Sequence, residues 1–283
     1  MPRYSHRSRT PRRNRGRFGP LFKLLCAAAV IVAMTVGATV FFRVETVSVT
    51  GNQRYTEEEI VAASGIQLGD NLYSLNKVRI DRSLRTSLPY IGELTINRSL
   101  PSTVVITVTE WEAVAQVAPP GPEQISAYQE AAGENAVSTA REPWLISMRG
   151  KLLEPAPTDS TAIAVTGLTV LAPQAGSFLE VPEAEQTRLE ALTGLLEALE
   201  ARETLREISS IRLESTYLVA RYAGRFDVKM KLNANFDYDV RLMQSVRQQV
   251  ENMEGIDAAG SIDLTQERYG AVYSSAKGVR PQS

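Results

Sequence analysis

The longest uncharged apolar stretch of the chain lies between Lys23 and Arg43 and is 19 residues long. At 1.5 Å per residue, a helix of that length spans roughly 28 Å, close to the roughly 30 Å thickness of membrane hydrocarbon. A cleaved signal peptide is the alternative, but its apolar core is usually only about 7–15 residues long. We therefore expect a membrane-spanning helix over residues 24–42. Its large apolar side chains form the anchor: Leu24, Leu25, Val30, Ile31, Val32, Val36, Val40, Phe41 and Phe42.

Residues 44–110 alternate between strand-like and helix-like patterns. Residues 44–50 alternate as a strand, and Thr56 with Glu59 forms a capping box that opens a helix ending near Gly65. A second helix is expected over residues 77–88, with Asn76 as its cap and an apolar stripe of Ile80, Leu84, Leu88 and Ile91. Strands follow at residues 93–97 and 103–109. The order β-α-α-β-β predicts a three-stranded sheet with two helices on one face.

The remainder of the chain predicts a larger mixed domain with a mostly antiparallel sheet and two helices, so the fold class is α+β. Residues 183–202 carry a leucine stripe, and residues 226–232 alternate apolar and charged side chains as a half-buried strand. Residues 119–142, rich in Pro, Ala, Gly and Glu, are expected to form an exposed loop. The second helix is expected near residues 238–253, with Leu242, Val246, Val250 and Met253 on its buried side. Further strands are expected at residues 143–148, 151–153, 208–213, 218–222, 261–265 and 269–274.

Charge is distributed very unevenly along the chain. The net charge is −1, yet residues 1–23 carry eight Lys and Arg side chains and no acid. By the positive-inside rule this places the N-terminus in the cytoplasm and the body outside. The body is mildly acidic, which argues against nucleic acid as its partner. The basic tail is interpreted as an orientation signal that also contacts anionic membrane lipid, with the signal in Arg12, Arg13, Arg15, Arg17 and Lys23.

The residue types needed for several catalytic chemistries are missing from the predicted body. The one cysteine, Cys26, lies in the apolar run, and the one histidine, His6, lies in the basic tail. A disulfide, a histidine zinc site and a Ser-His-Asp centre are therefore excluded there. The acid/base candidates are Asp227, Asp237 and Asp263, and each has a structural explanation. Asp227 is on the solvent-exposed face of its expected strand, Asp237 can cap a helix, and Asp263 alternates with apolar neighbours along a strand. We expect no catalytic residue, metal, cofactor or small-molecule substrate.

Several short motifs, in their order along the chain, resemble a known family. Residues 47–52 (VSVTGN), the helix from Thr56, then Gly65, Gly69 and Leu72 resemble a POTRA domain. A POTRA domain directly after an N-terminal anchor resembles the bacterial cell-division family FtsQ/DivIB. The Glu and Ala of that family's Glu-Arg-x-Pro-x-Ala motif are Glu110 and Ala115 here, whereas its Arg and Pro are absent. Residues 261–265 (SIDLT) resemble the family's terminal motif, with Thr265 where Arg is usual.

The resemblance implies a domain layout and a function. The layout is a cytoplasmic tail (1–23), the membrane helix (24–42), a POTRA domain (43–115), a β domain (116–275) and a C-terminal tail (276–283). The implied function is a non-enzymatic scaffold at the division septum of the bacterial plasma membrane. Its implied partners are small coiled-coil FtsB/DivIC-like and FtsL-like subunits and the septal transpeptidase and glycosyltransferase complex. The alternatives are an anchored POTRA protein for polypeptide transport or surface assembly, and an anchored cell-wall hydrolase.

The last expected strand is the candidate partner-binding site. A short C-terminal strand at the edge of a sheet leaves backbone groups to which a partner can add a strand. The residues assigned to this site are Tyr269, Ala271, Val272 and Tyr273. Alternation places the two tyrosines and Ala271 on one face, and tyrosines are frequent interface anchors. In the resembled family this region binds the coiled-coil partner. The alternative is that the tyrosines pack on the last helix.

Overall fold

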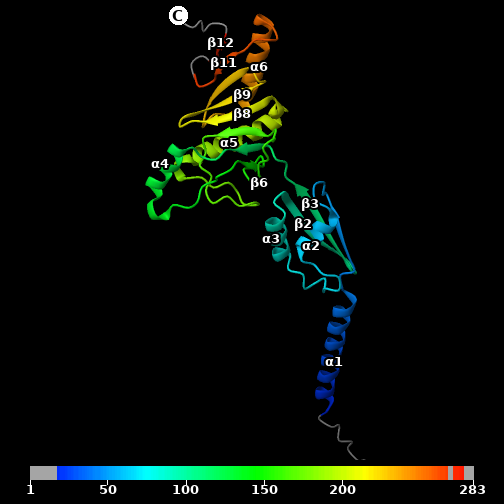
Figure 1. Cartoon of the computed structure of the whole chain (residues 1–283). Helices are drawn as coiled ribbons and strands as arrows, with labels where there is room; N and C mark the ends of the chain where they lie inside the picture. The colour runs from blue at the N-terminus through cyan, green and yellow to red at the C-terminus, as the bar shows by residue number, and fades with distance from the viewer. Residues whose placement is uncertain (1–17, 267–269, 277–283) are drawn as a thin grey trace, which may run out of the picture.

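The computed structural model describes residues 18–266 and 270–276. Figure 1 shows a long helix, α1, at one end of the molecule, a small α/β part in the middle and a larger sheet with its helices at the other end. In the described part of the chain, the strands form two sheets, one of three strands and one of nine. This mixed α+β architecture confirms the predicted fold class.

Helix α1 (Phe18–Phe41) projects from the folded body, and its side chains between Gly19 and Gly37 are not covered by the rest of the protein. Among the described residues it is the one helix long and apolar enough to cross a membrane. It begins before the expected residue 24, because Pro20 lies in the first turn, where the missing N–H costs no hydrogen bond. It ends at Phe41, so Phe42 lies outside the helix, half-buried, with its ring 5.1 Å from that of Tyr73.

The three-stranded part has the predicted order β-α-α-β-β. Its strands lie in the order β1-β3-β2, with β3 parallel to β1 and antiparallel to β2. Both predicted caps are present: Glu59 N donates to Thr56 Oγ1 at 3.2 Å, and Arg79 N donates to Asn76 Oδ1 at 3.1 Å. Gly65 ends the first helix with a φ of +67°, a conformation that favours glycine. The elements are β1 (Thr46–Thr50), α2 (Glu57–Ser64), α3 (Lys77–Ser87), β2 (Ile91–Ser99) and β3 (Thr103–Glu110).

The nine-stranded sheet runs in the order β12-β11-β10-β9-β8-β7-β4-β5-β6 within the described residues. Helices α5 (Gln186–Ala201) and α6 (Phe236–Glu254) pack on it, and their apolar residues join those of the strands in one core. Most neighbouring strands are antiparallel, as predicted. The strands are β4 (Ala115–Val117), β5 (Trp144–Ile146), β6 (Leu152–Pro155), β7 (Ile163–Thr166), β8 (Ile208–Leu213), β9 (Tyr217–Tyr222), β10 (Phe226–Lys231), β11 (Gly260–Asp263) and β12 (Val272–Ser275).

The segment 119–142 was predicted to be a loop, and this prediction is wrong. It contains helix α4 (Pro122–Ala132), followed by a 3-10 turn (Gly133–Asn135). Pro122 is at the helix start, and Gln124 Oε1 accepts a hydrogen bond from Gly121 N at 3.1 Å, so local signals start the helix. No residue of α4 is buried, which is why the sequence shows no apolar stripe there.

Two further details differ from the sequence prediction. The short strand β4 was not foreseen, and it places Ala115 in the nine-stranded sheet rather than at the end of the POTRA domain. In α6 the predicted stripe is right at Val250, which is buried, and at Leu242 and Val246, which are partly buried against the core. Met253 is instead 69% exposed, and Val240 and Met243, which were not predicted, are buried.

Polar and apolar contacts join the two sheets. Tyr90, Leu145 and Leu153 form a small buried cluster across the junction. The hydroxyl of Tyr90 donates to Glu154 at 2.6 Å, and Glu154 also pairs with Arg54 at 3.0 Å. The ammonium group of buried Lys151 donates to the Ile91 carbonyl at 2.8 Å. Burial and, to a smaller extent, the nearby positive charge of Arg85 together lower the pKa of Lys151 to about 8.

Candidate partner-binding edge

Strand β12 lies at one end of the nine-stranded sheet. It pairs antiparallel with β11, with Tyr273 opposite Ile262 and Ser275 opposite Gly260. In the described part of the chain, no other strand pairs with its outer side. The expectation that the last strand forms a sheet edge is therefore met by the fold, and its use by a partner stays a prediction.

The side chains of β12 alternate between the core and solvent. Val272 is 39% exposed and Ser274 is exposed, whereas Ala271 and Tyr273 are half-buried against the main core. The Tyr273 ring packs edge-on against buried Phe226, with centroids 6.4 Å apart. Tyr273 thus packs inward, the alternative weighed from the sequence, and the outward-facing side chain of the predicted set is Val272. Tyr269 lies outside the described residues.

The register also determines which backbone groups face the free edge. Ala276 N donates to Ala259 O at 2.9 Å, so the Ala276 amide points toward β11. Because backbone groups alternate in direction along an antiparallel strand, the amides of Ser274 and Val272 point the same way. The N–H and C=O of Tyr273 therefore point outward. The Tyr273 side chain anchors the strand, while its backbone faces the position of an added strand.

Two residues outside β12 hold the strand in place. Glu254, the last residue of α6, accepts hydrogen bonds from the Tyr273 hydroxyl and from Ser275 Oγ, each at 3.1 Å. Gly260 on β11 lies so close to β12 that a Cβ atom there would be 2.2 Å from the Ser274 carbonyl oxygen. A glycine at this position permits the close approach of the two strands.

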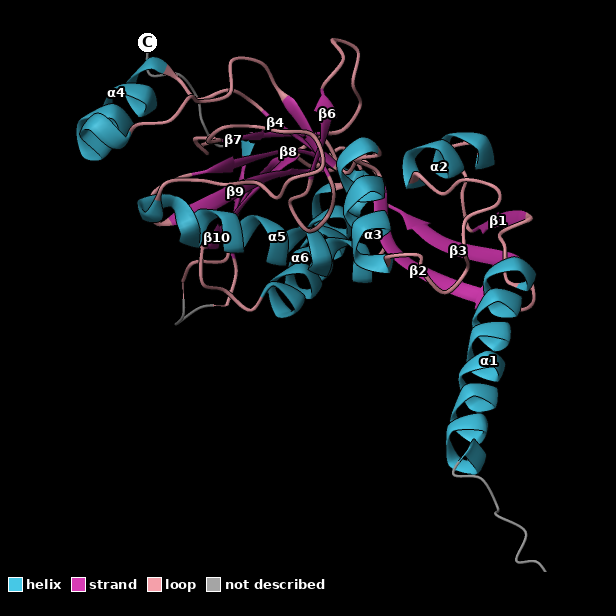
Figure 2. Ribbon diagram, turned by 90° about the horizontal axis from the view of Figure 1, so that it is seen from below, coloured by secondary structure: helices cyan, strands magenta, loops and turns pink. Residues whose placement is uncertain are grey.

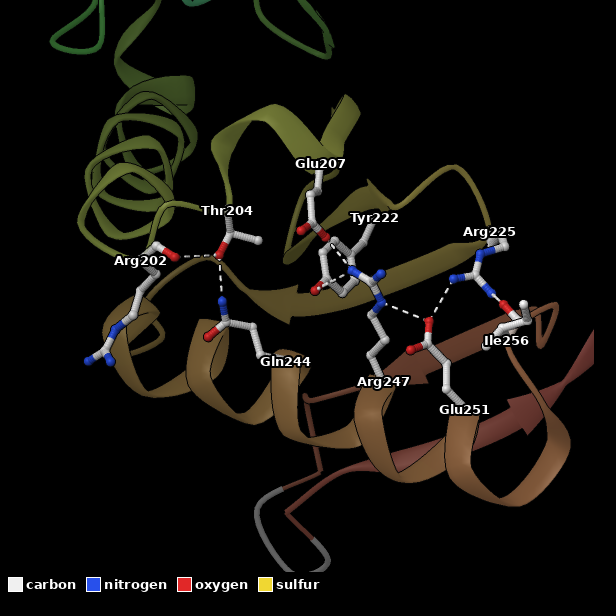
Figure 3. Close-up of polar contacts among 9 residues, drawn as sticks. All are labelled: Arg202, Thr204, Glu207, Tyr222, Arg225, Gln244, Arg247, Glu251 and Ile256. Carbon is white, nitrogen blue, oxygen red and sulfur yellow. Dashed lines mark hydrogen bonds and ion pairs between the residues drawn. The ribbon is translucent and has the colours of Figure 1, made fainter.

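A network of arginines and acids fixes α6 against the strands beneath it (Figure 3). Glu251 accepts hydrogen bonds from Arg225 at 2.6 Å and from Arg247 at 2.9 Å. Arg247 also contacts Glu207 and donates to the Tyr222 hydroxyl at 3.0 Å. These contacts tie the C-terminal half of α6 to the end of β9, to the turn between β9 and β10, and to Glu207 just before β8.

The same network holds the segment that leads into β11. Arg225 donates to the carbonyl of Ile256 and, at 3.0 Å, to that of Ala258. The hydrogen bond from Arg247 lowers the pKa of Glu251, and the hydrogen bond to Glu251 raises the pKa of Arg247. Burial raises the pKa of Tyr222. At neutral pH Glu251 and Arg247 are therefore charged, and the Tyr222 hydroxyl is neutral.

The residues that hold β12 and α6 in place differ in whether the sequence indicates their contacts. Arg247 and Glu251 are four residues apart on a helix, a spacing at which opposite charges pair, so this pair was readable. Arg225, Glu254 and Gly260 carry no local signal, because their partners are 14 to 33 residues away in the chain. Sequence reasoning missed these three residues.

The three acid/base candidates lie in separate structural contacts. Asp227 pairs with Arg221 at 2.9 Å on the exposed side of β10. Asp263 Oδ1 accepts from Thr265 N at 2.8 Å and from Thr265 Oγ1 at 2.6 Å. Asp237 is not the helix cap as predicted; Asn235 Oδ1 accepts from Tyr238 N at 3.2 Å instead, because its position just before the first turn suits that bond. Asp237 pairs with Arg202 at 2.6 Å, and this hydrogen bond lowers its pKa.

The rest of the predicted site and anchor residues fall into two groups. Arg12, Arg13, Arg15 and Arg17 lie outside the described residues, while Lys23 is within α1. The anchor residues Leu24, Leu25, Val30, Ile31, Val32, Val36 and Phe41 are all exposed along α1. Across residues 18–266 and 270–276, no three His, Cys, Asp or Glu side chains are grouped so that they would hold a metal ion.

Within residues 18–266 and 270–276, the structure combines one candidate membrane helix, a two-helix three-stranded domain and a larger sheet with a free edge. The family model described as "POTRA domain, FtsQ-type" matches residues 42–111. The chain therefore carries a POTRA domain of the FtsQ type, and its predicted resemblance to the FtsQ/DivIB cell-division family is confirmed.

Curated relatives carry the same family names. The cell division protein DivIB of Geobacillus kaustophilus is 37% identical over 71 residues, which is 25% of this chain and 27% of the relative. The cell division protein FtsQ of Corynebacterium glutamicum is 28% identical over 93 residues, 31% of this chain and 41% of the relative. The FtsQ protein of Streptomyces coelicolor is 31% identical over 98 residues, 32% of this chain and 37% of the relative. The matches thus span less than half of each relative's length.

Proposed function

We propose that this protein is a non-enzymatic scaffold of the bacterial division machinery. It would be anchored by α1 in the plasma membrane at the septum, with its N-terminus in the cytoplasm and both folded parts outside. It would connect small coiled-coil membrane subunits of the FtsB/DivIC and FtsL kind with the septal transpeptidase and glycosyltransferase.

The single observation that carries this proposal is the FtsQ-type POTRA domain directly after a membrane-length helix. Relatives named as cell division proteins, from several genera, match between 25% and 32% of this chain. The excess of positive charge before α1 supports the cytoplasmic placement of the N-terminus.

The β12 edge supports a mode of binding. A partner strand that adds to β12 would bond to the outward N–H and C=O of Tyr273, and its side chains would meet Val272 and Ser274. Backbone bonds would supply affinity, and the exposed side chains would supply selectivity. The network around Glu251 supports this mode, because it holds α6 and the segment entering β11 rigid behind the edge.

Cell biology tests the division role directly. In the source organism, depletion should give filamentous cells, and a fluorescent fusion should form a band at mid-cell. Normal septation with diffuse membrane fluorescence would contradict the proposal, and it would favour the alternative of an anchored POTRA protein for polypeptide transport or surface assembly.

The hydrolase alternative has its own test. Purified protein is incubated with peptidoglycan, and soluble fragments are measured. We expect no release of fragments. Release that is abolished by Asp227→Asn or Asp263→Asn would replace the scaffold by an anchored cell-wall hydrolase.

A further inference from the structure

Three large apolar side chains are exposed at the end of the POTRA domain nearest α1. They are Leu68 at 73%, Tyr73 at 54% and Leu100 at 59% exposure. We call these three residues the base surface. Leu68 and Tyr73 lie in the loop between α2 and α3, and Leu100 lies in the turn between β2 and β3. Figures 1 and 2 both show the end of β2 beside the end of α1.

Backbone hydrogen bonds tie the α2–α3 loop to the residues that leave α1. Leu72 N donates to Phe42 O, Val44 N to Asp70 O, and Gly69 N to Val44 O, each at 2.8 Å. Val44 is three residues beyond Phe41, so it is at most roughly 11 Å from the helix end. Leu68 precedes Gly69 directly and is therefore held at about the same height above the end of the helix.

The β2–β3 turn is tied to the same short segment. Glu45 N and Thr46 N both donate to Ser102 O, at 2.8 and 3.3 Å, and Ser102 Oγ donates to Glu45 Oε2 at 2.9 Å. Leu100 lies two residues before this anchor point. Both parts of the base surface are thus fixed within a few residues of the point where α1 ends, so their position relative to the helix is set by hydrogen bonds rather than by a linker.

The residues around the base surface have the composition of a membrane interface. The rings of Phe41, Phe42 and Tyr73 form consecutive edge-on contacts, with centroids 5.3 and 5.1 Å apart. Arg43 is exposed beside them, whereas the half-buried Arg98 donates to the Tyr73 and Leu75 carbonyls, at 3.4 and 3.0 Å, and thereby holds the loop. Aromatic side chains gather at the level of lipid head groups, and arginines there extend toward the phosphates. The head-group layer is about 5–8 Å deep on each side of the hydrocarbon, and Leu72 of the α2–α3 loop is bonded to Phe42, one residue beyond the end of α1.

We propose that the base surface is a lipid-binding surface, with Leu68, Tyr73 and Leu100 inserted among the head groups of the bilayer that α1 crosses. The occupant is phospholipid, because the side chains are fixed to the end of the anchor itself. The POTRA domain would then sit directly on the membrane at one height and tilt. The proposal rests on the proposed function in one respect, which is that α1 spans the membrane.

Spin labels in the full-length protein test this surface. In a Cys26→Ala background, Leu68→Cys, Tyr73→Cys and Leu100→Cys are labelled and reconstituted in nanodiscs of phosphatidylcholine and phosphatidylglycerol. Collision rates with lipid-soluble oxygen and with a water-soluble nickel complex are compared. Ile256→Cys, at a site 78% exposed in the larger sheet part, is the matched aqueous control, and Val30→Cys within α1 is the membrane control.

The expected result is an oxygen-to-nickel ratio at the three base positions several-fold above that at position 256. Ratios at the three base positions equal to that at position 256, with a high ratio at position 30, would contradict lipid binding by the base surface. The proposal that α1 spans the membrane would then still hold. Low collision rates with both reagents would mean a protein occupant, and they would also contradict lipid binding. A low ratio at position 30 as well would show that α1 is not in the membrane, so the anchor of the proposed function would fail first.

Discussion

The hydroxyl of Tyr273 on β12 donates a hydrogen bond to the carboxylate of Glu254 at the end of α6, over 3.1 Å. The same carboxylate accepts from Ser275 Oγ at 3.1 Å. The edge strand is thus held from its inward side by the final residue of α6, and its position depends on where that helix ends.

Replacing Glu254 should loosen the edge strand without unfolding the sheet. In Glu254→Ala both hydrogen bonds are lost, and the free energy of unfolding should fall by only about 1 kcal/mol because the site is exposed to water. Hydrogen exchange at the amides of Val272 and Ser274 should become several-fold faster. Asp257→Ala, at an exposed acid in the following loop, is the control and should leave exchange in β12 unchanged. Unchanged exchange in Glu254→Ala would contradict this role.

Strand addition at β12 predicts a difference between two substitutions of one residue. Tyr273→Pro and Tyr273→Ala both remove the ring and the hydroxyl, but only proline removes the outward N–H. Binding of a coiled-coil division subunit, measured by co-purification and by a Kd, should weaken at least about tenfold more in the proline variant, since further backbone bonds beside the proline are also disrupted. Equal binding by both variants, each folded by circular dichroism, would place the partner elsewhere.

The close approach of β11 and β12 predicts that Gly260 tolerates no side chain. In Gly260→Ala the new Cβ would lie 2.2 Å from the Ser274 carbonyl oxygen, so β12 must shift. We expect a loss of about 1–3 kcal/mol in the free energy of unfolding, with weaker partner binding. Gly121→Ala is the matched control, because its φ of −70° suits alanine and its nearest neighbour atom is 3.9 Å away. A Gly260→Ala protein as stable as the control would contradict the geometry.

The network around Glu251 predicts a loss of stability in acid. The hydrogen bond from Arg247 lowers the pKa of Glu251 below its ordinary value of 4.5. A carboxylate whose pKa is depressed by folding contributes stability above the ordinary value, and this contribution is lost as the pH falls through the folded-state pKa. Glu251→Gln should therefore cost about 2 kcal/mol at pH 7, and the difference from wild type should shrink as the pH falls below about 4.5.

Urea unfolding at several pH values, followed by tryptophan fluorescence, measures this difference. Glu190→Gln, at an exposed acid on α5, is the control and should differ little from wild type at any pH. A Glu251→Gln deficit that stays constant from pH 7 to pH 3 would mean that packing, rather than charge, explains the effect.

Lys151 predicts a gain of stability at alkaline pH. Burial lowers its pKa to about 8 from 10.5 in the unfolded chain. Between these values the unfolded state binds more protons, so the free energy of unfolding should rise with pH, by up to about 3 kcal/mol. Lys151→Met should lack this rise, whereas Lys77→Met, at an exposed lysine, should retain it. If wild type and Lys151→Met depend on pH in parallel from 8 to 10.5, Lys151 is charged in the folded protein.

Local patterns were sufficient for much of the fold. The run between Lys23 and Arg43 specifies α1 by length and lack of charge alone. Thr56 with Glu59, and Asn76, specify the starts of α2 and α3, because a cap acts on amides only two or three residues away. Alternation along 226–231 likewise specified the two faces of β10. Helix α4 was missed because it buries nothing and therefore has no apolar stripe.

The candidate site depended on the tertiary structure. The sequence by itself determined that a short strand follows α6 and that it alternates, but two faces of a strand look alike until the sheet and helix are in place. Only the assembled sheet put β12 at the edge, turned Tyr273 toward Phe226 and placed Gly260, Glu254 and Arg225 around the segment. The physical reason is the sequence separation of the interacting residues. Helix caps and hydrophobic periodicities act within one or two turns of the chain. Strand order and the arginine network join residues far apart in the chain, so these contacts stabilise the protein only when the whole domain has folded.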